Sequence, residues 1–257
     1  MDLIADHISH RFGTLDVLDD VSFTVAAGEV VAIVGPSGCG KSTLLSILGG
    51  LLQPNKGAAE LRGAPPADSL NPLTFVFQDF ALLPWCTVEA NVEFPLAHTA
   101  LDATTRRAVV DDALGRTGLS DFRGAYPKQL SGGMRQRVGI ARALAVRPAI
   151  LLMDEPLSAL DSQTRELLME DFIRLLADGA MGAVYVTHNL EEAVRIADRI
   201  VVLSRRPGRV REVVTIPVTR DERGGIDARG KLLSLQNELW SLIREEAIDA
   251  EREVQHA

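Results

Sequence analysis

The sequence predicts an α/β protein built around a buried sheet, and three observations lead to this fold class. Apolar residues make up 46% of the 257 residues but aromatic residues only 5%, a composition that suits alternating strands and helices. Residues 29–34 (EVVAIV) form an apolar, β-branched run, and residues 41–48 (KSTLLSIL) have a helical pattern, with a glycine-rich stretch between them. A second apolar run, at residues 150–153, ends in an acidic pair. Ligands of open α/β sheets lie beyond the carboxyl ends of the strands, so we expect the functional residues there.

The chain before the first buried strand is expected to form an antiparallel β subdomain. Residues 3–10 and 21–25 have strand patterns, and we predict a polar turn around Asp16 between them. Phe12 lies in this connection. Two interpretations of Phe12 remain open: an aromatic of the core or loop, or a platform on which a nucleobase stacks.

The glycine-rich stretch GPSGCGKST, residues 35–43, is the central motif of the chain. Its glycines allow the backbone to curl until several N–H groups converge on phosphate oxygens. Lys41 adds a positive charge for the β- and γ-phosphates, and the Ser42 hydroxyl is expected to ligate Mg²⁺. The N-terminus of the following helix favours an anion at the same place. The predicted nucleotide-binding residues of this loop are Gly35, Pro36, Ser37, Gly38, Cys39, Gly40, Lys41, Ser42 and Thr43.

Charge, cysteine content and hydropathy limit the possible functions. A net charge of −8 argues against a general nucleic-acid binder, because such proteins usually have a basic face. Cys39 and Cys86 have no paired spacing, which indicates a reducing compartment without a disulfide framework. We expect neither a signal peptide at the N-terminus nor a membrane-spanning segment, since no uncharged apolar run approaches about 18–20 residues.

The middle of the chain is expected to be a helical insertion between two strands. Residues 58–61 and 73–77 have strand patterns, and Gln78 follows the second of them, where it could ligate Mg²⁺ or orient water. Residues 79–146 are mostly helical in pattern. Trp85 lies in a turn there, and two interpretations remain open: contact with a partner, or packing within its own subdomain.

A second candidate anion site lies at LSGGMRQR, residues 130–137. Ser131 is a good N-cap, and apolar residues recur at helical spacing after it. Gly132 and Gly133 are costly in a first helical turn, which is understandable if a ligand must approach the backbone closely. A capped helix start with free N–H groups favours a phosphate, so the chain presents two phosphate-binding helix ends.

The remaining candidate residues follow two further strands. Asp154 is positioned to serve Mg²⁺ and Glu155 to act as a general base or to orient water, directly after the strand at 150–153. Asp161 follows shortly after, before a helix predicted at 164–177 that ends at residues 178–179. His188 follows a strand at 183–187 and is expected to contact the γ-phosphate. A strand at 200–203 is predicted to close the sheet.

The texture of the sequence changes after about residue 204. Residues 205–209 (RRPGR) form a basic turn, and residues 219–231 are polar and glycine-rich, which predicts a flexible loop. Leu232, Leu235, Leu239 and Leu242 mark an amphipathic helix. We expect the charged tail after Glu245 to fray.

The order of GPSGCGKST, LSGGMRQR and ILLMDEP strongly resembles the nucleotide-binding subunit of ABC transporters, over residues 1–204. The resemblance implies a P-loop NTPase (RecA-like) core with an inserted helical subdomain at about 79–146, followed by a small C-terminal extension at 205–257. The stretches VFQDFALLPWCTVEANV and SRRPGRV are similar to the importer group for nitrate, sulfonates and taurine.

The resemblance also implies a role for each motif, with ATP and Mg²⁺ as ligands. Residues 35–43 match Walker A, Gln78 the Q-loop, and residues 130–136 the signature. Asp154 and Glu155 match the Walker B aspartate and the catalytic glutamate, while Asp161 belongs to the D-loop and His188 is the switch histidine. Phe12 matches the aromatic that stacks on adenine, although many relatives have Tyr. The implied catalytic set is Lys41, Gln78, Glu155 and His188, and the implied metal ligands are Ser42, Gln78 and Asp154.

Relatives of this kind dimerise head to tail, so that Ser131, Gly132 and Gly133 of one copy cover the γ-phosphate held by the other. The implied partners are a second cassette, transmembrane permease subunits and, indirectly, a periplasmic or extracellular solute-binding protein, at the cytoplasmic face of the cell membrane. Two other hypotheses are a soluble ABC ATPase that acts on nucleic acid or ribosomes, and a P-loop kinase or GTPase. The single cassette disfavours the first, and the signature and His188 disfavour the second.

Overall fold

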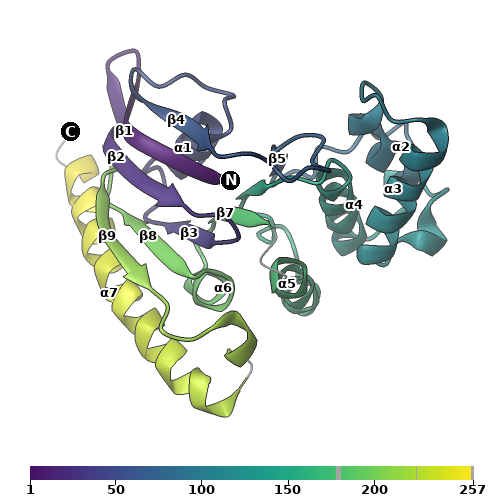
Figure 1. The fold of residues 1–257 in the computed structure, drawn as a ribbon. Coiled ribbons are helices and arrows are strands. Elements are labelled where there is room, and N and C mark those ends of the chain that lie inside the picture. Colours follow the sequence, from purple (N-terminus) through teal and green to yellow (C-terminus); the bar gives the residue numbers. More distant parts are fainter. Residues whose placement is uncertain (178–180, 224, 256–257) are drawn as a thin grey trace.

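Two sheets and a separate group of helices make up the molecule (Figure 1). The computed structural model describes residues 1–177, 181–223 and 225–255. The smaller sheet is antiparallel with the order β2-β1-β4, and the larger has the order β5-β6-β7-β3-β8-β9. The strands are β1 (Asp2–Phe12), β2 (Leu15–Val25), β3 (Val30–Val34), β4 (Lys56–Arg62), β5 (Leu73–Val76), β6 (Ile150–Asp154), β7 (Gly182–Val186), β8 (Arg199–Leu203) and β9 (Val210–Thr215). These two sheets confirm the predicted α/β class.

The first five strands of the larger sheet are parallel, whereas β9 pairs antiparallel with β8. Strands β3, β6 and β7 are buried on both faces apart from Asp154, which explains their nearly continuous apolar sequences. The helices are α1 (Lys41–Leu48), α2 (Val88–Glu93), α3 (Ala103–Arg116), α4 (Gly132–Leu144), α5 (Ser162–Ala177), α6 (Leu190–Ile196) and α7 (Ile226–Gln255). None of the helices in the described part of the chain is long and apolar enough to cross a membrane.

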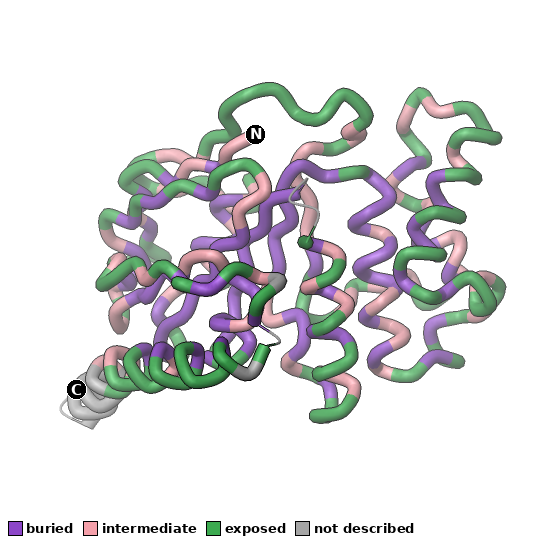
Figure 2. The backbone as a smooth tube through the Cα atoms, turned by 60° about the horizontal axis from the view of Figure 1, so that its bottom comes forward, coloured by how far each residue is buried: buried purple, intermediate pink, exposed green. Residues whose placement is uncertain are grey.

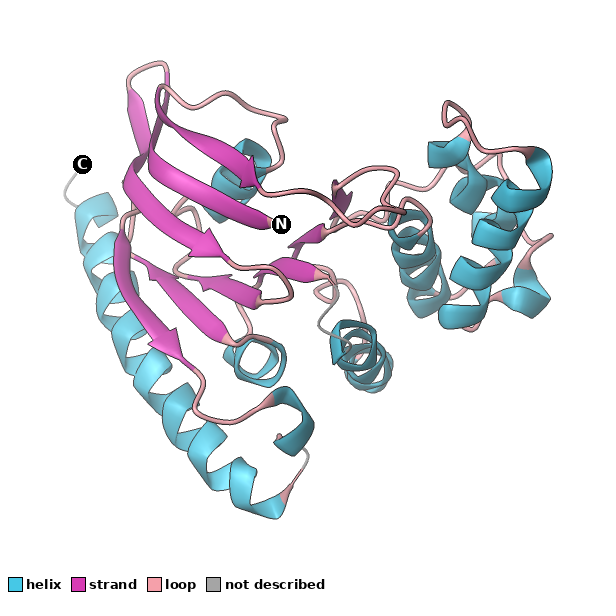
Figure 3. Ribbon diagram, viewed as in Figure 1, coloured by secondary structure: helices cyan, strands magenta, loops and turns pink. Residues whose placement is uncertain are grey.

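Among the described residues, three hydrophobic clusters hold these layers together. One lies between the smaller sheet, α1 and one face of the larger sheet, and a second lies on the opposite face, beneath α5, α6 and α7. The third is the core of the inserted helices α2, α3 and α4, which form an all-helical lobe apart from the strands (Figure 3). Buried residues are concentrated in the central strands and on the inward faces of the helices (Figure 2).

The structure corrects four predictions about local structure. Asp16 lies within β2, not in a turn, because the hairpin turns at Gly13, which has a φ of +60°. The strand at 200–203 does not close the sheet, since β9 adds a further edge strand. The loop predicted at 219–231 instead contains a short 3₁₀ turn and the start of α7. The helix also continues through Gln255, where we expected a frayed tail.

The early start of α7 has a physical reason. Ala228 is buried together with Leu232, Leu235 and Leu239, so the apolar face begins one turn before the leucine stripe that the sequence analysis used. Burial of that face outweighs the low helix propensity of Gly230. The predicted helix end at residues 178–179 lies outside the described residues.

Candidate functional site

The phosphate-loop sequence connects β3 to α1, as predicted. Gly40 precedes α1 with a φ of +105°, and a Cβ atom there would lie 2.7 Å from Cδ2 of Leu18. Both the backbone angle and the close contact with β2 therefore require glycine. Lys41 is buried, and its ammonium donates hydrogen bonds to the carbonyl oxygens of Gly35 at 2.9 Å and Pro36 at 3.0 Å. The lysine charge is thus held inside the loop.

Cys39 belongs to the same loop and is buried, with 1% of its surface exposed. Burial raises the pKa of its thiol, and the nearby Lys41 opposes this effect. A buried thiol with a raised pKa is poorly reactive, because the thiolate is the nucleophile. We therefore regard Cys39 as part of the loop packing.

The acidic pair lies at the carboxyl end of β6, next to the loop. The Ser42 hydroxyl donates a hydrogen bond of 3.2 Å to Oδ1 of Asp154. Burial raises the pKa of Asp154, with a smaller contribution from the charge of Glu155, and the Ser42 hydrogen bond opposes the shift. The Asp154 carboxylate and the Ser42 hydroxyl are both hard oxygen ligands, which suit Mg²⁺. This ion takes few protein ligands and completes its coordination shell with water and phosphate. Within the described residues, no group of three or more His, Cys, Asp and Glu side chains could hold a metal by itself.

Glu155 has an unusual backbone conformation. Its φ is +44°, a region that non-glycine residues seldom adopt. Its N–H donates a 2.9 Å hydrogen bond to the carbonyl oxygen of Val186 at the end of β7, which fixes this conformation. Its Oε2 lies 3.0 Å from Nδ1 of His188. Strained residues of this kind occur preferentially at functional sites, so the backbone conformation supports a functional role for the Glu155 carboxylate.

The parallel sheet brings most of the predicted residues to one edge. Gln78, Glu155 and His188 follow the neighbouring strands β5, β6 and β7, and the phosphate loop follows β3, next to β7. Gln78 is exposed in this structure. The expectation that strand-end residues gather at one edge is therefore confirmed by the topology.

Ser131 caps α4 as predicted, since its side chain accepts a 3.2 Å hydrogen bond from the N–H of Met134. The second glycine also has a packing reason that the sequence did not reveal. A Cβ atom on Gly133 would lie 2.5 Å from Cγ2 of Thr164 on α5, and one on Gly132 would lie 3.4 Å from Leu160. The start of α4 therefore packs against α5 and the loop before it. In Figure 1, α4 lies in the helical lobe beyond β5, and α1 lies beneath the smaller sheet.

The Asp161 carboxylate forms hydrogen bonds with the backbone at the start of α5. Its Oδ1 accepts hydrogen bonds from the N–H groups of Gln163 at 3.1 Å and Thr164 at 3.0 Å. These bonds, above all the one from Thr164, lower the pKa of Asp161. The carboxylate thus acts locally as a helix cap.

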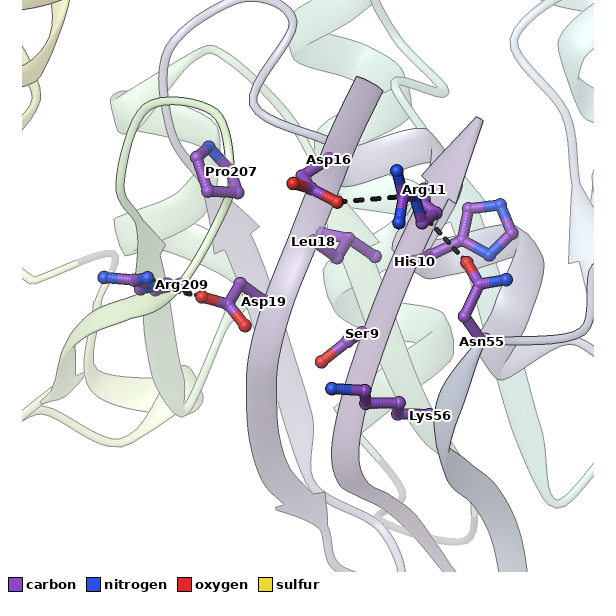
Figure 4. Close-up of a pocket in the computed structure, with 10 residues that line it drawn as sticks. All are labelled: Ser9, His10, Arg11, Asp16, Leu18, Asp19, Asn55, Lys56, Pro207 and Arg209. Carbon is purple, nitrogen blue, oxygen red and sulfur yellow. Dashed lines mark hydrogen bonds and ion pairs between the residues drawn. The ribbon is translucent and has the colours of Figure 1, made fainter. Parts of the chain in front are cut away.

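Phe12 ends β1 with 51% of its surface exposed, and the His10 ring lies edge-on to it at a centroid distance of 4.6 Å. His10 also lines a cavity of about 350 Å³ between the hairpin, the start of β4 and the turn after β8 (Figure 4). Leu18 lines this cavity as well and contacts the phosphate loop through Gly40.

The turn between β8 and β9 also touches the phosphate loop, which the sequence analysis missed. A Cβ atom on Gly208 would lie 2.3 Å from the carbonyl oxygen of Cys39. Hydrogen bonds with Val17 and Asp19 fix this turn on β2. The only sequence signal was the glycine in RRPGR, which predicts a turn but not its neighbour.

Comparison with known proteins extends these observations over most of the chain. A family model described as "ABC transporter" matches residues 18–158. A putative ATP-binding protein of Brucella abortus biovar 1 (strain 9-941) is 37% identical over 252 residues, which cover 98% of this chain and 96% of that protein. The taurine import ATP-binding protein TauB of Chromobacterium violaceum is 41% identical, with 88% of each chain covered. The dimeric post-hydrolysis state of the ATP-binding cassette MJ0796 bound to ADP and Pi has a TM-score of 0.72 at 34% identity, covering 84% of this chain and 100% of that one.

Proposed function

The chain belongs to the ABC transporter family, and we propose that it is the ATP-hydrolysing subunit of an importer for a small solute such as a sulfonate, taurine or nitrate. As a member of this family it binds and hydrolyses ATP. Its similarity to an ATP-binding protein named for taurine import supports an importer over a soluble ATPase that acts on nucleic acid or ribosomes.

Within one copy, we assign the nucleotide to the loop at residues 35–43. Phe12 would stack on the adenine, because its ring is exposed at the end of β1. The N–H groups of the loop and the start of α1 would receive the phosphates, and the Lys41 ammonium, already inside the loop, would turn from carbonyl oxygens to phosphate oxygens. We propose the cassette at residues 1–204, its helical subdomain at 79–146 and the extension at 205–257 as its parts.

Ser42, Asp154 and Gln78 would hold Mg²⁺, and the first two already face each other at 3.2 Å. When bound, the ion neutralises charge on the β- and γ-phosphates. For Asp154, a cation would also offset the cost of its burial. Gln78 is exposed at the end of the neighbouring strand, where it can approach the same ligands.

Glu155 would accept a proton from the attacking water, and His188 would contact the γ-phosphate. The single observation that best supports hydrolysis at this site is the 3.0 Å contact between Glu155 Oε2 and His188 Nδ1, at the edge that also holds Lys41 and Asp154. A positioned base of this kind contributes about 10²–10⁴ in rate.

The remaining half of the site would come from a second copy. Gly132 lies against Leu160 and Gly133 against Thr164 of α5 in their own chain, rather than against the phosphate loop. Their N–H groups would therefore cap the γ-phosphate of a partner in a head-to-tail dimer, with the Asp161 loop at the interface. The solved dimeric cassette with ADP and Pi supports such a pairing. ATP would stabilise the closed dimer because both copies contact it.

The dimer would dock on permease subunits at the cytoplasmic face of the cell membrane and serve a solute-binding protein on the other side. Trp85, with 73% of its surface exposed in the helical lobe, is our candidate permease contact. The name of the taurine-import relative supports the permease partner.

The test is steady-state hydrolysis by the purified chain and by Glu155→Gln. The variant should retain ATP binding, lose at least about 100-fold in kcat, and form an ATP-dependent dimer in size-exclusion chromatography. Hydrolysis by Glu155→Gln at the rate of the unsubstituted protein would refute the base assignment. A dimer that forms equally with and without ATP would refute the proposal that ATP lies between the two copies and stabilises the dimer.

A further inference from the structure

A buried carboxylate lies directly behind the proposed switch histidine. The side chain of Glu192, on α6, is only 7% exposed. Its Oε2 accepts hydrogen bonds from the hydroxyl groups of Thr187 at 2.8 Å and Tyr185 at 3.0 Å. Its Oε1 accepts one from the Asn189 amide at 3.3 Å and lies 3.8 Å from the Arg165 guanidinium. Both oxygens are therefore used.

Two of these donors flank His188 in the chain. The Thr187 hydroxyl that donates to Glu192 also accepts a 3.0 Å hydrogen bond from the N–H of Asn189. The Asn189 side chain in turn caps α6 by accepting from the N–H groups of Glu191 and Glu192. The backbone on both sides of His188 is thus tied to one carboxylate.

The His188 side chain itself has little support from packing. It is 63% exposed, whereas Glu155 is 22% exposed. Its approach to Glu155 therefore depends on the loop ends that Glu192 holds. A shift of about 1 Å in a catalytic group can cost about 100-fold in rate, so this support matters for hydrolysis.

The network also reaches the loop that precedes α5. Arg165 donates hydrogen bonds to the carbonyl oxygens of Leu160 at 2.9 Å and Leu157 at 3.4 Å. These residues lie on either side of Ser158, in the loop that we propose to lie at the dimer interface. Arg165 is thus placed between this loop and Glu192.

We propose that Glu192 is a positioning residue for ATP hydrolysis, which fixes the loop carrying His188 and connects it through Arg165 to the loop at residues 158–161. The inference rests on the proposed function of Glu155 and His188. Glu192 does not touch the nucleotide. It acts by holding the imidazole against the Glu155 carboxylate.

The test uses Glu192→Gln, with Glu191→Gln as the matched control. The control removes a charge from the adjacent, exposed position of the same helix. Glu192→Gln keeps the shape but places an amide NH₂ group among donors. We expect its kcat to fall by about 10- to 100-fold, with KM for ATP within about twofold, because the phosphate loop is untouched. Glu191→Gln should match the unsubstituted protein.

A spectroscopic readout separates this role from a general loss of stability. The imidazole ¹⁵N signals of His188, assigned with His188→Ala, should move in Glu192→Gln toward those of Glu155→Gln, in which the carboxylate partner is absent. If kcat falls while these signals stay in place, Glu192 does not act through His188 and the proposal is wrong. An unchanged kcat would equally overturn it.

Thr187→Val provides a second variant should Glu192→Gln fold poorly. It removes only the hydroxyl that joins Glu192 to the Asn189 N–H, and it should lower kcat and move the His188 signals in the same direction. A folded Thr187→Val with the kcat and signals of the unsubstituted protein would reject the network. If Glu155→Gln itself hydrolyses ATP at the rate of the unsubstituted protein, the proposed roles of Glu155 and His188 fail. That outcome differs from the failure of the Glu192 proposal alone, in which Glu155→Gln is inactive and Glu192→Gln is not impaired.

Discussion

Gly208→Ala tests whether the turn after β8 positions the phosphate loop. The added Cβ would lie 2.3 Å from the Cys39 carbonyl oxygen, while real Cβ contacts are essentially never shorter than 3.0 Å, so the turn or the loop must move by about 0.7 Å. Hydrogen bonds from Gly208 to Val17 and from Asp19 to Gly208 hold the turn in place. We therefore expect the loop to move.

Overpacking of this kind costs about 1–3 kcal/mol. If that cost falls on the nucleotide-binding conformation of the loop, ATP affinity drops by about 5-fold to about 140-fold, since 1.4 kcal/mol corresponds to tenfold. The assay is equilibrium titration with a fluorescent ATP analogue, together with the thermal midpoint of unfolding.

Gly230→Ala is the matched control, because Gly230 lies in α7 with nothing within 4 Å of an added Cβ. It should raise the thermal midpoint slightly, as Ala is favoured over Gly in a helix by about 0.5–1 kcal/mol, and leave ATP affinity unchanged. If Gly208→Ala lowers the midpoint but binds ATP as tightly as the unsubstituted protein, the turn has yielded instead of the loop, and our reasoning is refuted.

Three further predictions concern single side chains. Asp154→Asn should raise the thermal midpoint at pH 7 in Mg²⁺-free buffer and weaken Mg²⁺-dependent hydrolysis. Because burial raises the pKa of Asp154, its carboxyl favours folding below its pKa in the unfolded chain and loses that contribution as pH rises through its pKa in the folded protein. The increase in thermal midpoint caused by Asp154→Asn should therefore vanish in acid. In a Cys86→Ser background, maleimide should label Cys39 slowly, since the thiol is buried with a raised pKa, and ATP should slow it further; equal rates would place the loop elsewhere. Trp85→Ala should change the free energy of unfolding by no more than about 0.5 kcal/mol, because the side chain is exposed. It should reduce co-purification with the permease, and unchanged co-purification would exclude that contact.

The edge residues could be predicted from sequence because their positions follow from one rule. Gln78, the pair Asp154–Glu155 and His188 each come at the end of a largely apolar strand, and parallel strands end at the same edge of a sheet. The Ser131 cap was equally accessible, since capping depends on a residue and the three that follow it. Local pattern and strand direction are sufficient for features of this kind.

Other features depend on contacts between distant segments, which no local pattern records. The close approach of Gly208 to Cys39 and of Gly133 to Thr164 arises only when the sheet and helices are assembled. No local pattern singles out Glu192, and only its burial and the hydrogen bond that it accepts from Thr187 set it apart. The addition of β9 as the edge strand likewise depends on pairing with β8 rather than on its own sequence, most of which is exposed.

Helix α5 connects the two halves of the proposed mechanism. Near its start it packs against Gly133 through Thr164 and holds the preceding loop through Arg165. Two turns later, Asp171 forms an ion pair of 2.7 Å with Arg137 of the signature helix α4. The segment that would cap the partner's nucleotide is therefore fastened to the same helix that, through Arg165 and Glu192, supports the loop of His188.

A displacement of α4 by a partner's γ-phosphate must accordingly be transmitted to α5 or break its contacts with it. Because Arg137 and Asp171 are each about one-third exposed, their ion pair alone contributes little. The Gly133–Thr164 contact is close-packed and cannot stretch gradually. We therefore expect Gly133→Ala, which would force α4 away from Thr164, to impair hydrolysis in its own copy as well as capping in the partner. Mixed dimers that contain one such copy should lose turnover at both sites, whereas loss at the partner's site alone would show that α5 does not couple them.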